Sequence, residues 1–67
     1  MAIMKVIEVL AESSESWEDA TAQGILKASK SVHHIKSAFV QSQSVTVGDD
    51  GKVDKYRVNL KLTFEVA

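Results

Sequence analysis

The last stretch of the chain carries a strict alternation of apolar and polar residues. From residue 56 to residue 66 every even-numbered residue is apolar and every odd-numbered residue is polar. The apolar set is Tyr56, Val58, Leu60, Leu62, Phe64 and Val66. Because successive side chains of a β-strand point to opposite faces, this pattern predicts one long strand with a dry face and a wet face. Such a strand needs partners on its edges and a layer that covers its dry face.

The size of the chain predicts a single domain, residues 1–67, that is supported by other copies of itself. A chain of 67 residues buries too little apolar surface for a robust core. It contains no cysteine, which excludes disulfides and thiolate zinc sites. His33 and His34 are adjacent and would point to opposite faces of a strand, so they are a poor metal pair. Oligomerisation is the remaining means of support.

Charge and hydropathy exclude several classes of partner. The formal net charge is −1 with both signs spread along the chain, so we expect neither a nucleic acid nor a membrane surface as partner. No apolar run approaches the roughly 20 residues that a membrane helix needs. The first residues contain Lys5 and Glu8 and no cleavage-site pattern follows, so we expect a soluble, cytoplasmic protein.

The remainder of the chain predicts two further strands and one helix. Residues 3–11 form a strand with two largely apolar faces, and we expect another subunit to cover the second face. Residues 15–31 form a helix whose apolar stripe contains Trp17 and Gly24. Residues 33–47 form a strand with a phase change at 41–44, and residues 48–52 form a hairpin turn. The helix is a crossover, so the first two strands run parallel and the third inserts between them.

Two groups of acidic residues have a structural and a functional interpretation. Ser13 or Ser14 is predicted to cap the helix, and Glu15, Glu18 and Asp19 follow. The simpler interpretation is that these acids stabilise the positive end of the helix dipole, and the alternative is a cation site. In the turn, Asp49 and Asp50 are most simply turn formers, with a calcium role as the alternative.

Four stretches supply landmarks over nearly the whole chain. They are Lys-Val-Ile-Glu at 5–8, Ser-Glu-Ser-Trp-Glu-Asp-Ala at 14–20, Ala-Ser-Lys-Ser-Val at 28–32 and Tyr-Arg-Val-Asn-Leu-Lys-Leu-Thr-Phe at 56–64. In this order they resemble the dodecin family. The resemblance implies an α+β fold with a β-α-β-β subunit and a three-stranded sheet of order 1-3-2 that partly wraps one helix. It also implies a hollow homo-dodecamer built from trimers.

The same resemblance marks positions where this chain departs from the flavin-binding members. Ser37 stands where a tryptophan stacks on the flavin ring, and Arg57 stands where a glutamine hydrogen-bonds that ring. Ser44 stands where many members have an arginine suited to a cofactor phosphate. Aromatic stacking contributes on the order of 1 kcal/mol beyond the buried area, so its loss on both faces of a ligand disfavours flavin. The chain looks more similar to a branch described as calcium-binding, which lacks the tryptophan too.

These observations predict a non-enzymatic, dodecin-type binding and storage protein. The sequence contains no recognisable nucleophile–base–acid arrangement and no phosphate loop, so an enzyme is not expected. The ligand is predicted to be a small molecule or cation, of calcium type rather than flavin type. One alternative is a riboflavin- or FMN-binding dodecin with a degenerate pocket at Ser37 and Arg57. The other alternative is a ligand-free structural or interaction assembly. The metal candidates are Glu15, Glu18 and Asp19.

Overall fold

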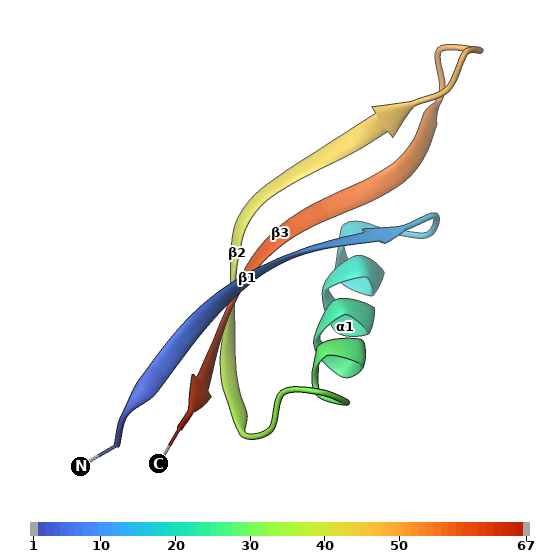
Figure 1. The fold of residues 1–67 in the computed structure, drawn as a ribbon. Coiled ribbons are helices and arrows are strands. Elements are labelled where there is room, and N and C mark those ends of the chain that lie inside the picture. Colours follow the sequence, from blue (N-terminus) through green and yellow to red (C-terminus); the bar gives the residue numbers. More distant parts are fainter. Residues whose placement is uncertain (1, 67) are drawn as a thin grey trace.

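One helix lies on one face of a curved, three-stranded sheet (Figure 1). The computed structural model describes residues 2–66, with the elements β1 (Met4–Ser13), α1 (Trp17–Ala28), β2 (Ile35–Val47) and β3 (Val53–Glu65). Both β1 and β2 pair antiparallel with β3, and the strand order is β1-β3-β2. The two outer strands therefore run parallel to each other on either side of β3, which confirms the predicted fold class and strand order.

The alternation of β3 decides where the core lies. Val58, Leu60 and Leu62 are fully buried, and Ala20 of α1 is buried against them. Full burial of side chains of this size stabilises a fold by about 1.5–3 kcal/mol each. The predicted dry face is thus the face that meets the helix over residues 58–62. The prediction was wrong for Val66, which lies beyond the end of β3 and is 51% exposed. The strand itself begins at Val53, earlier than predicted, because its hairpin pairing with β2 continues beyond residue 56.

The N-cap of the helix lies two or three residues later than predicted. Ser16, rather than Ser13 or Ser14, is the N-cap, and its hydroxyl oxygen accepts the Asp19 N–H at 2.9 Å. Ser13 instead accepts the N–H groups of Glu15 and Ser16, at 2.9 and 3.4 Å. Ser16 has the extended backbone of an N-cap, with φ of −171° and ψ of 166°, and directly precedes the first helical residue, Trp17. Ser13 therefore stabilises the loop that leads into the helix.

The helix also ends earlier than predicted, at Ala28 rather than at residue 31. The hydroxyl groups of Ser29 and Ser31 donate back to carbonyls of the last helical turn, at 2.6 and 3.4 Å, which competes with continued helix. His34 then adopts a left-handed backbone with φ of 64°, and β2 starts at Ile35. The prediction of a strand from residue 33 was wrong, because both His33 and His34 lie in this reversal.

Gly24 allows the helix to lie close to the sheet. A Cβ at this position would be 2.9 Å from the Cβ of Ala11 on β1 and 3.2 Å from Cδ1 of Leu60 on β3. Both distances are shorter than ordinary van der Waals contact, so a larger residue would force the two layers apart. The predicted close approach of the helix at Gly24 is confirmed.

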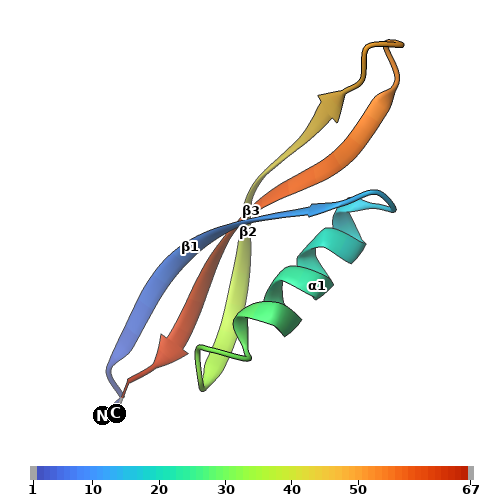
Figure 2. The same cartoon turned by 45° about the vertical axis from the view of Figure 1, so that its right-hand side comes forward.

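The hairpin formed by β2 and β3 extends well past the end of β1 (Figures 1 and 2). The last pair between β1 and β3 is Ser13 with Tyr56, whereas β2 and β3 continue to Val47 and Val53. This extension gives the subunit a long axis of 52 Å. The predicted phase change in β2 is confirmed as a register shift between Val40 and Ser42. We call residues 46–54, the hairpin beyond β1, the arm.

One face of β1 is uncovered within the described chain. Val6 and Leu10 are 58% and 53% exposed, whereas Ile7 and Val9 are half-buried against the core. The expectation that both faces are covered is therefore not met by one subunit, because the single helix can cover only one face of the sheet. Cover for the second face from another subunit stays a prediction.

Candidate functional site

The candidate site lies on the face of the sheet that points away from the helix. In an antiparallel sheet, residues opposite each other share a face. Arg57 of β3 lies opposite Glu12 of β1 on one side and Ser44 of β2 on the other. Its neighbours along β3, Val58 and Tyr56, point to the helix side because side chains alternate. Glu12, Arg57 and Ser44 therefore form one row across the three strands.

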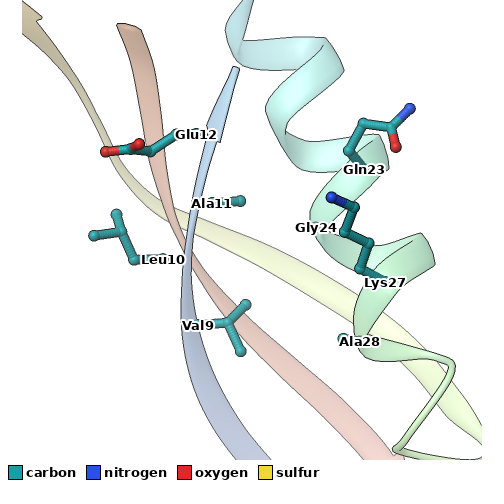
Figure 3. Close-up of a pocket in the computed structure, with 8 residues that line it drawn as sticks. All are labelled: Val9, Leu10, Ala11, Glu12, Gln23, Gly24, Lys27 and Ala28. Carbon is teal, nitrogen blue, oxygen red and sulfur yellow. The ribbon is translucent and has the colours of Figure 1, made fainter.

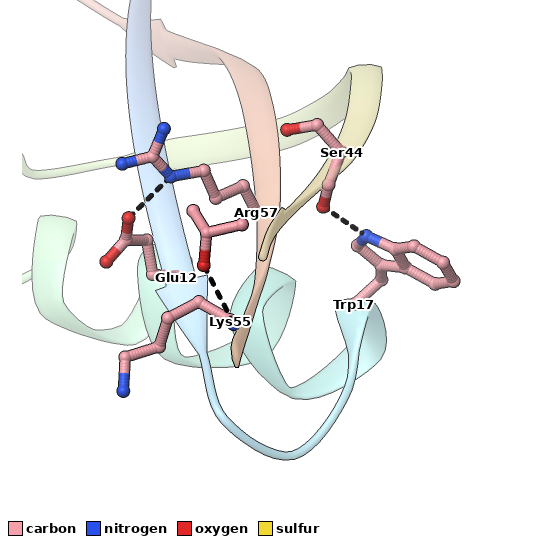
Figure 4. A network of polar contacts seen from close by, with 6 residues as sticks. Glu12, Trp17, Ser44, Lys55 and Arg57 are labelled. Atoms are coloured by element: carbon pink, nitrogen blue, oxygen red, sulfur yellow. Dashed lines mark hydrogen bonds and ion pairs between the residues drawn. The ribbon is translucent and has the colours of Figure 1, made fainter. Parts of the chain in front are cut away.

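Arg57 is already engaged by an acid of its own subunit. Nε of Arg57 donates to Oε1 of Glu12 at 2.5 Å, across the β1–β3 ladder (Figure 4). The side chains are 41% and 39% exposed, so this ion pair is screened by water and adds little to stability. Its main effect is geometric, because it holds the guanidinium over the sheet. Glu12 was not identified from the sequence. Its place opposite Arg57 follows from the register of β1 and β3, which the sequence did not supply.

Trp17 connects the start of the helix to the base of the arm. Its indole N–H donates to the carbonyl oxygen of Ser44 at 2.9 Å (Figure 4). Its ring meets the ring of Tyr56 edge-on, with centroids 5.1 Å apart. Aromatic pairs in this geometry contribute about 0.5–1.5 kcal/mol beyond their buried area. Trp17 is half-buried and packs against the core, which confirms its prediction as an anchor of the helix. The anchor also orients the strand segment that carries Ser44.

Ser37 and Arg57 lie too far apart to line one pocket of a single subunit. Ser37 of β2 is exposed and lies opposite Thr63 of β3, six residues along the strand from Arg57. At about 3.3 Å per residue these positions are separated by roughly 20 Å. A ligand that touched both positions at once would therefore need residues from two copies of the chain.

The acidic residues near the helix start do not form one binding cluster. Glu15 precedes the N-cap, so only Glu18 and Asp19 lie in the first helical turn. Oδ2 of Asp19 accepts the Ser13 hydroxyl at 2.7 Å, so this carboxylate stabilises the local fold. Glu15 and Glu18 are exposed. Among residues 2–66 no group of three or more histidine, cysteine or acidic side chains is arranged to hold a metal ion.

Asp50 acts as a turn former. Oδ1 of Asp50 accepts the N–H of Lys52 at 3.0 Å, and Gly51 adopts φ of 79°. A left-handed backbone at this position favours glycine, so Asp-Gly suits the turn by backbone geometry alone. The turn-forming prediction for Asp50 is confirmed. Asp49 is exposed, and the turn at the end of the arm lies far from the start of α1 (Figure 1).

Two open grooves flank the helix, one on each side. The first has a volume of about 430 Å³ and lies between α1 and β1, with Gly24 and Ala28 facing Val9 and Ala11 (Figure 3). The second has a volume of about 480 Å³ and lies between α1 and β2. Its lining contains Trp17, Glu18, Thr21, Ala22, Ile25, Val40 and Gln43. The two grooves are large enough, and their linings apolar enough, to accept a side chain or part of a small molecule.

Comparison with known proteins identifies the family. Residues 3–67 match the family model described as Dodecin. The chain is 36% identical over 66 residues to a protein of Mycobacterium tuberculosis named calcium dodecin, covering 98% of this chain and 92% of that protein. This chain belongs to the dodecin family. Dodecins are non-enzymatic binding and storage proteins, and the family is homo-dodecameric.

Solved dodecin structures share the fold of this dodecin. The crystal structure of the Mycobacterium tuberculosis calcium dodecin, described as having a novel calcium-binding site, has a TM-score of 0.86 at 35% identity, covering 97% of this chain and 91% of that chain. A dodecin mutant from Thermus thermophilus has a TM-score of 0.90 at 27% identity, covering 100% and 98%. The dodecin of Streptomyces davaonensis, at 23% identity and a TM-score of 0.92, covering 98% and 96%, shows the fold alone. The membership of the dodecin family that the four landmark stretches predicted is confirmed.

The described part of this dodecin has no membrane helix. Within residues 2–66 the single helix α1 is too short and too polar to cross a bilayer.

Proposed function

We propose that this dodecin is a non-enzymatic, homo-dodecameric storage protein that holds a calcium-type cation rather than a flavin. The observation that carries the proposal is the state of the two flavin-related positions. Ser37 offers no aromatic surface, and Arg57 is occupied by Glu12 within its own subunit. A planar ligand would meet neither a stacking partner nor a free amide there. The relative named calcium dodecin supports the cation as the ligand class.

The exposed apolar surface supports the assembly. Only four apolar residues of the described chain are fully buried, while Phe39 and Leu10 are 65% and 53% exposed on the face away from the helix. Apolar patches of this kind on a small chain mark contacts with other copies. A closed symmetric assembly would bury them and would raise the stability of a chain whose own core is small.

Calcium ligands would have to come from more than one copy. Calcium takes six to eight oxygen ligands, and the described residues of one subunit do not converge on such a set. We propose Glu15 and Glu18 as contributors, because both carboxylates are exposed next to the helix start. Asp19 would contribute less to calcium binding, since one of its carboxylate oxygens already accepts the Ser13 hydroxyl. Symmetry would supply the remaining oxygens by bringing equivalent acids together.

A calcium titration by calorimetry tests this proposal on the intact assembly. The protein is first treated with a chelator and then titrated separately with calcium, magnesium and riboflavin. We expect saturable calcium binding, weaker magnesium binding because magnesium gives up its water less readily, and no heat from riboflavin. Saturable riboflavin binding with no calcium binding would contradict the proposal and would support the degenerate flavin pocket.

Matched variants test the proposed ligands. Glu15→Gln with Glu18→Gln should weaken calcium binding at least tenfold, because both charged oxygens are lost while the side-chain volume is kept. Glu8→Gln makes the same chemical change on exposed β1, away from the helix start, and serves as the control. Equal loss in the control would indicate a general charge effect rather than a site.

A further inference from the structure

The irregularity in β2 turns two residues toward the helix that regular alternation would separate. Val40 lies opposite the fully buried Leu60, on the helix side of the sheet. Gln43 lies opposite the fully buried Val58, on the same side. In a regular strand, residues three apart point to opposite faces, and the register shift between Val40 and Ser42 removes this difference. Bulges recur next to binding sites because they redirect a side chain in this way.

Val40 and Gln43 form one wall of the groove between α1 and β2, and the helix forms the other wall. The groove has a volume of about 480 Å³, which is typical of sites for small molecules. Trp17, Thr21 and Ile25 line it from the helix. The Thr21 hydroxyl donates to the carbonyl oxygen of Trp17 at 2.9 Å, so Thr21 turns mainly its methyl group outward. The body of a ligand in this groove meets an apolar surface.

The indole ring of Trp17 is held in place before any ligand arrives. Its N–H donates to the carbonyl oxygen of Ser44 (Figure 4), and the ring meets that of Tyr56 edge-on. Trp17 is half-buried, so part of its ring surface stays open to the groove. Tryptophan is the side chain that best attracts a cation to its ring face, and a ring that is already fixed loses little freedom on binding.

The charge of the α1–β2 groove favours a cation. Among residues 2–66, Glu18 is the single charged residue that lines it, and its side chain is exposed. Glu18 lies in the first helical turn, where the helix dipole contributes roughly half a positive charge, less than the full negative charge of the carboxylate. The α1–β1 groove differs, because it is lined by both Lys27 and Glu12. The excess of negative charge is therefore specific to the α1–β2 groove.

We propose that the α1–β2 groove binds a small organic cation, a primary ammonium group on a compact apolar body. The apolar body lies between Trp17, Ile25 and Val40. The ammonium group lies against the indole ring and pairs with the carboxylate of Glu18, and the amide oxygen of Gln43 is its second acceptor. The inference goes beyond the proposed storage of a calcium-type cation and shares only Glu18 with it.

Fluorescence of Trp17 reports binding, because it is the single tryptophan of the chain. The intact assembly is treated with a chelator and titrated with 2-phenylethylammonium, with the neutral 2-phenylethanol and with the anion phenylacetate. We expect a saturable change with the ammonium, about threefold to tenfold weaker binding of the alcohol, and no saturable change with phenylacetate. Binding of the alcohol or the anion as tight as that of the ammonium, or no saturable change with the ammonium, would overturn the proposal.

Glu18→Gln tests the role of the charge while it keeps the volume of the side chain. The affinity for 2-phenylethylammonium should fall by about threefold to tenfold, to that of the alcohol, and the affinity for the alcohol should stay the same. Glu8→Gln is the control, because Glu8 is an exposed acid of β1 that does not line this groove. An unchanged ammonium affinity in Glu18→Gln, or an equal loss in the control, would contradict the site.

Ala22→Leu tests the groove itself. Ala22 lines the groove from an exposed position of the helix, so a leucine can occupy the space of the ligand with little cost to the helix. We expect at least a tenfold loss of ammonium affinity. Gln23→Leu makes a similar change one residue further on, beside the other groove, and should keep the affinity. Full affinity in Ala22→Leu would place the ligand elsewhere and overturn the proposal.

A calcium titration of the same samples separates this inference from the proposed function. Calcium binding without ammonium binding would overturn the α1–β2 site alone. Ammonium binding without calcium binding would overturn the proposed calcium storage alone.

Discussion

The two faces of β3 sit in different surroundings. On the helix side, Val58, Leu60 and Leu62 are fully buried against the rest of the same chain. On the opposite side, the strand carries the Arg57–Glu12 pair and is flanked by Leu10 and Phe39, which are more than half exposed. The helix side is thus explained by the folding of one subunit. The opposite side needs a ligand or a second copy to explain it.

Leu62→Ala is the change with the largest expected effect on this comparison. It should lower the free energy of unfolding by about 2–5 kcal/mol, because the site is fully buried and the truncation leaves a cavity. Urea unfolding measures the loss at several chain concentrations. The control is Val6→Ala on the opposite face, which should cost less than about 0.5 kcal/mol in dissociated chains. A loss under about 0.5 kcal/mol for Leu62→Ala would mean that the two faces were assigned wrongly.

Ser37→Trp with Arg57→Gln sharpens the comparison from the opposite face. The double variant supplies a stacking surface and a neutral hydrogen-bonding amide, so we expect riboflavin affinity to rise by about tenfold or more. Quenching of riboflavin fluorescence measures the change, and either single variant alone should gain less. No quenching by the double variant would count against the alignment of these positions with the flavin site.

Gly24→Ala tests how closely the two layers meet. Alanine is better than glycine in a helix by about 1 kcal/mol, but the new methyl would lie 2.9 Å from the Cβ of Ala11, and overpacking costs about 1–3 kcal/mol. We therefore expect a net loss of about 1 kcal/mol in thermal or urea unfolding. Gln23→Ala, on the exposed side of the same helix, should change stability by less than about 0.5 kcal/mol. A more stable Gly24→Ala variant would show that the layers can separate freely.

Glu12→Gln should have the smallest effect on stability, about 0.2–1 kcal/mol, because the pair with Arg57 is partly exposed. Its expected consequence lies in binding. Once released from Glu12, the Arg57 guanidinium should gain affinity for inorganic phosphate or sulfate. Calorimetry with either anion measures this, and Arg57→Gln in the same background should abolish it. An unfolding loss above about 2 kcal/mol would indicate a buried role for the pair.

Local patterns predicted the fold well because they follow from backbone geometry. The alternation along β3, the Asp50–Gly51 turn and the small residue at Gly24 each correspond to one structural requirement. The helix start was misplaced because Ser13, Ser14 and Ser16 are chemically equivalent as caps. The reversal at His34 had no sequence signal, since a left-handed backbone at histidine is uncommon.

The candidate site was less predictable because it depends on register and on other copies. Glu12 and Arg57 are far apart in sequence and meet only through the pairing of β1 with β3. Ser37 and Arg57 share a face but are separated by roughly 20 Å along it. No pattern within one chain encodes how two copies meet, so the ligand oxygens could not be assigned from residue types alone.

Native mass spectrometry of the purified assembly tests the central claim most directly. We predict a mass of twelve chains, with small adducts of calcium that a chelator removes and no flavin mass. A single-chain mass would contradict the assembly, and twelve chains carrying a flavin would contradict the proposed ligand class.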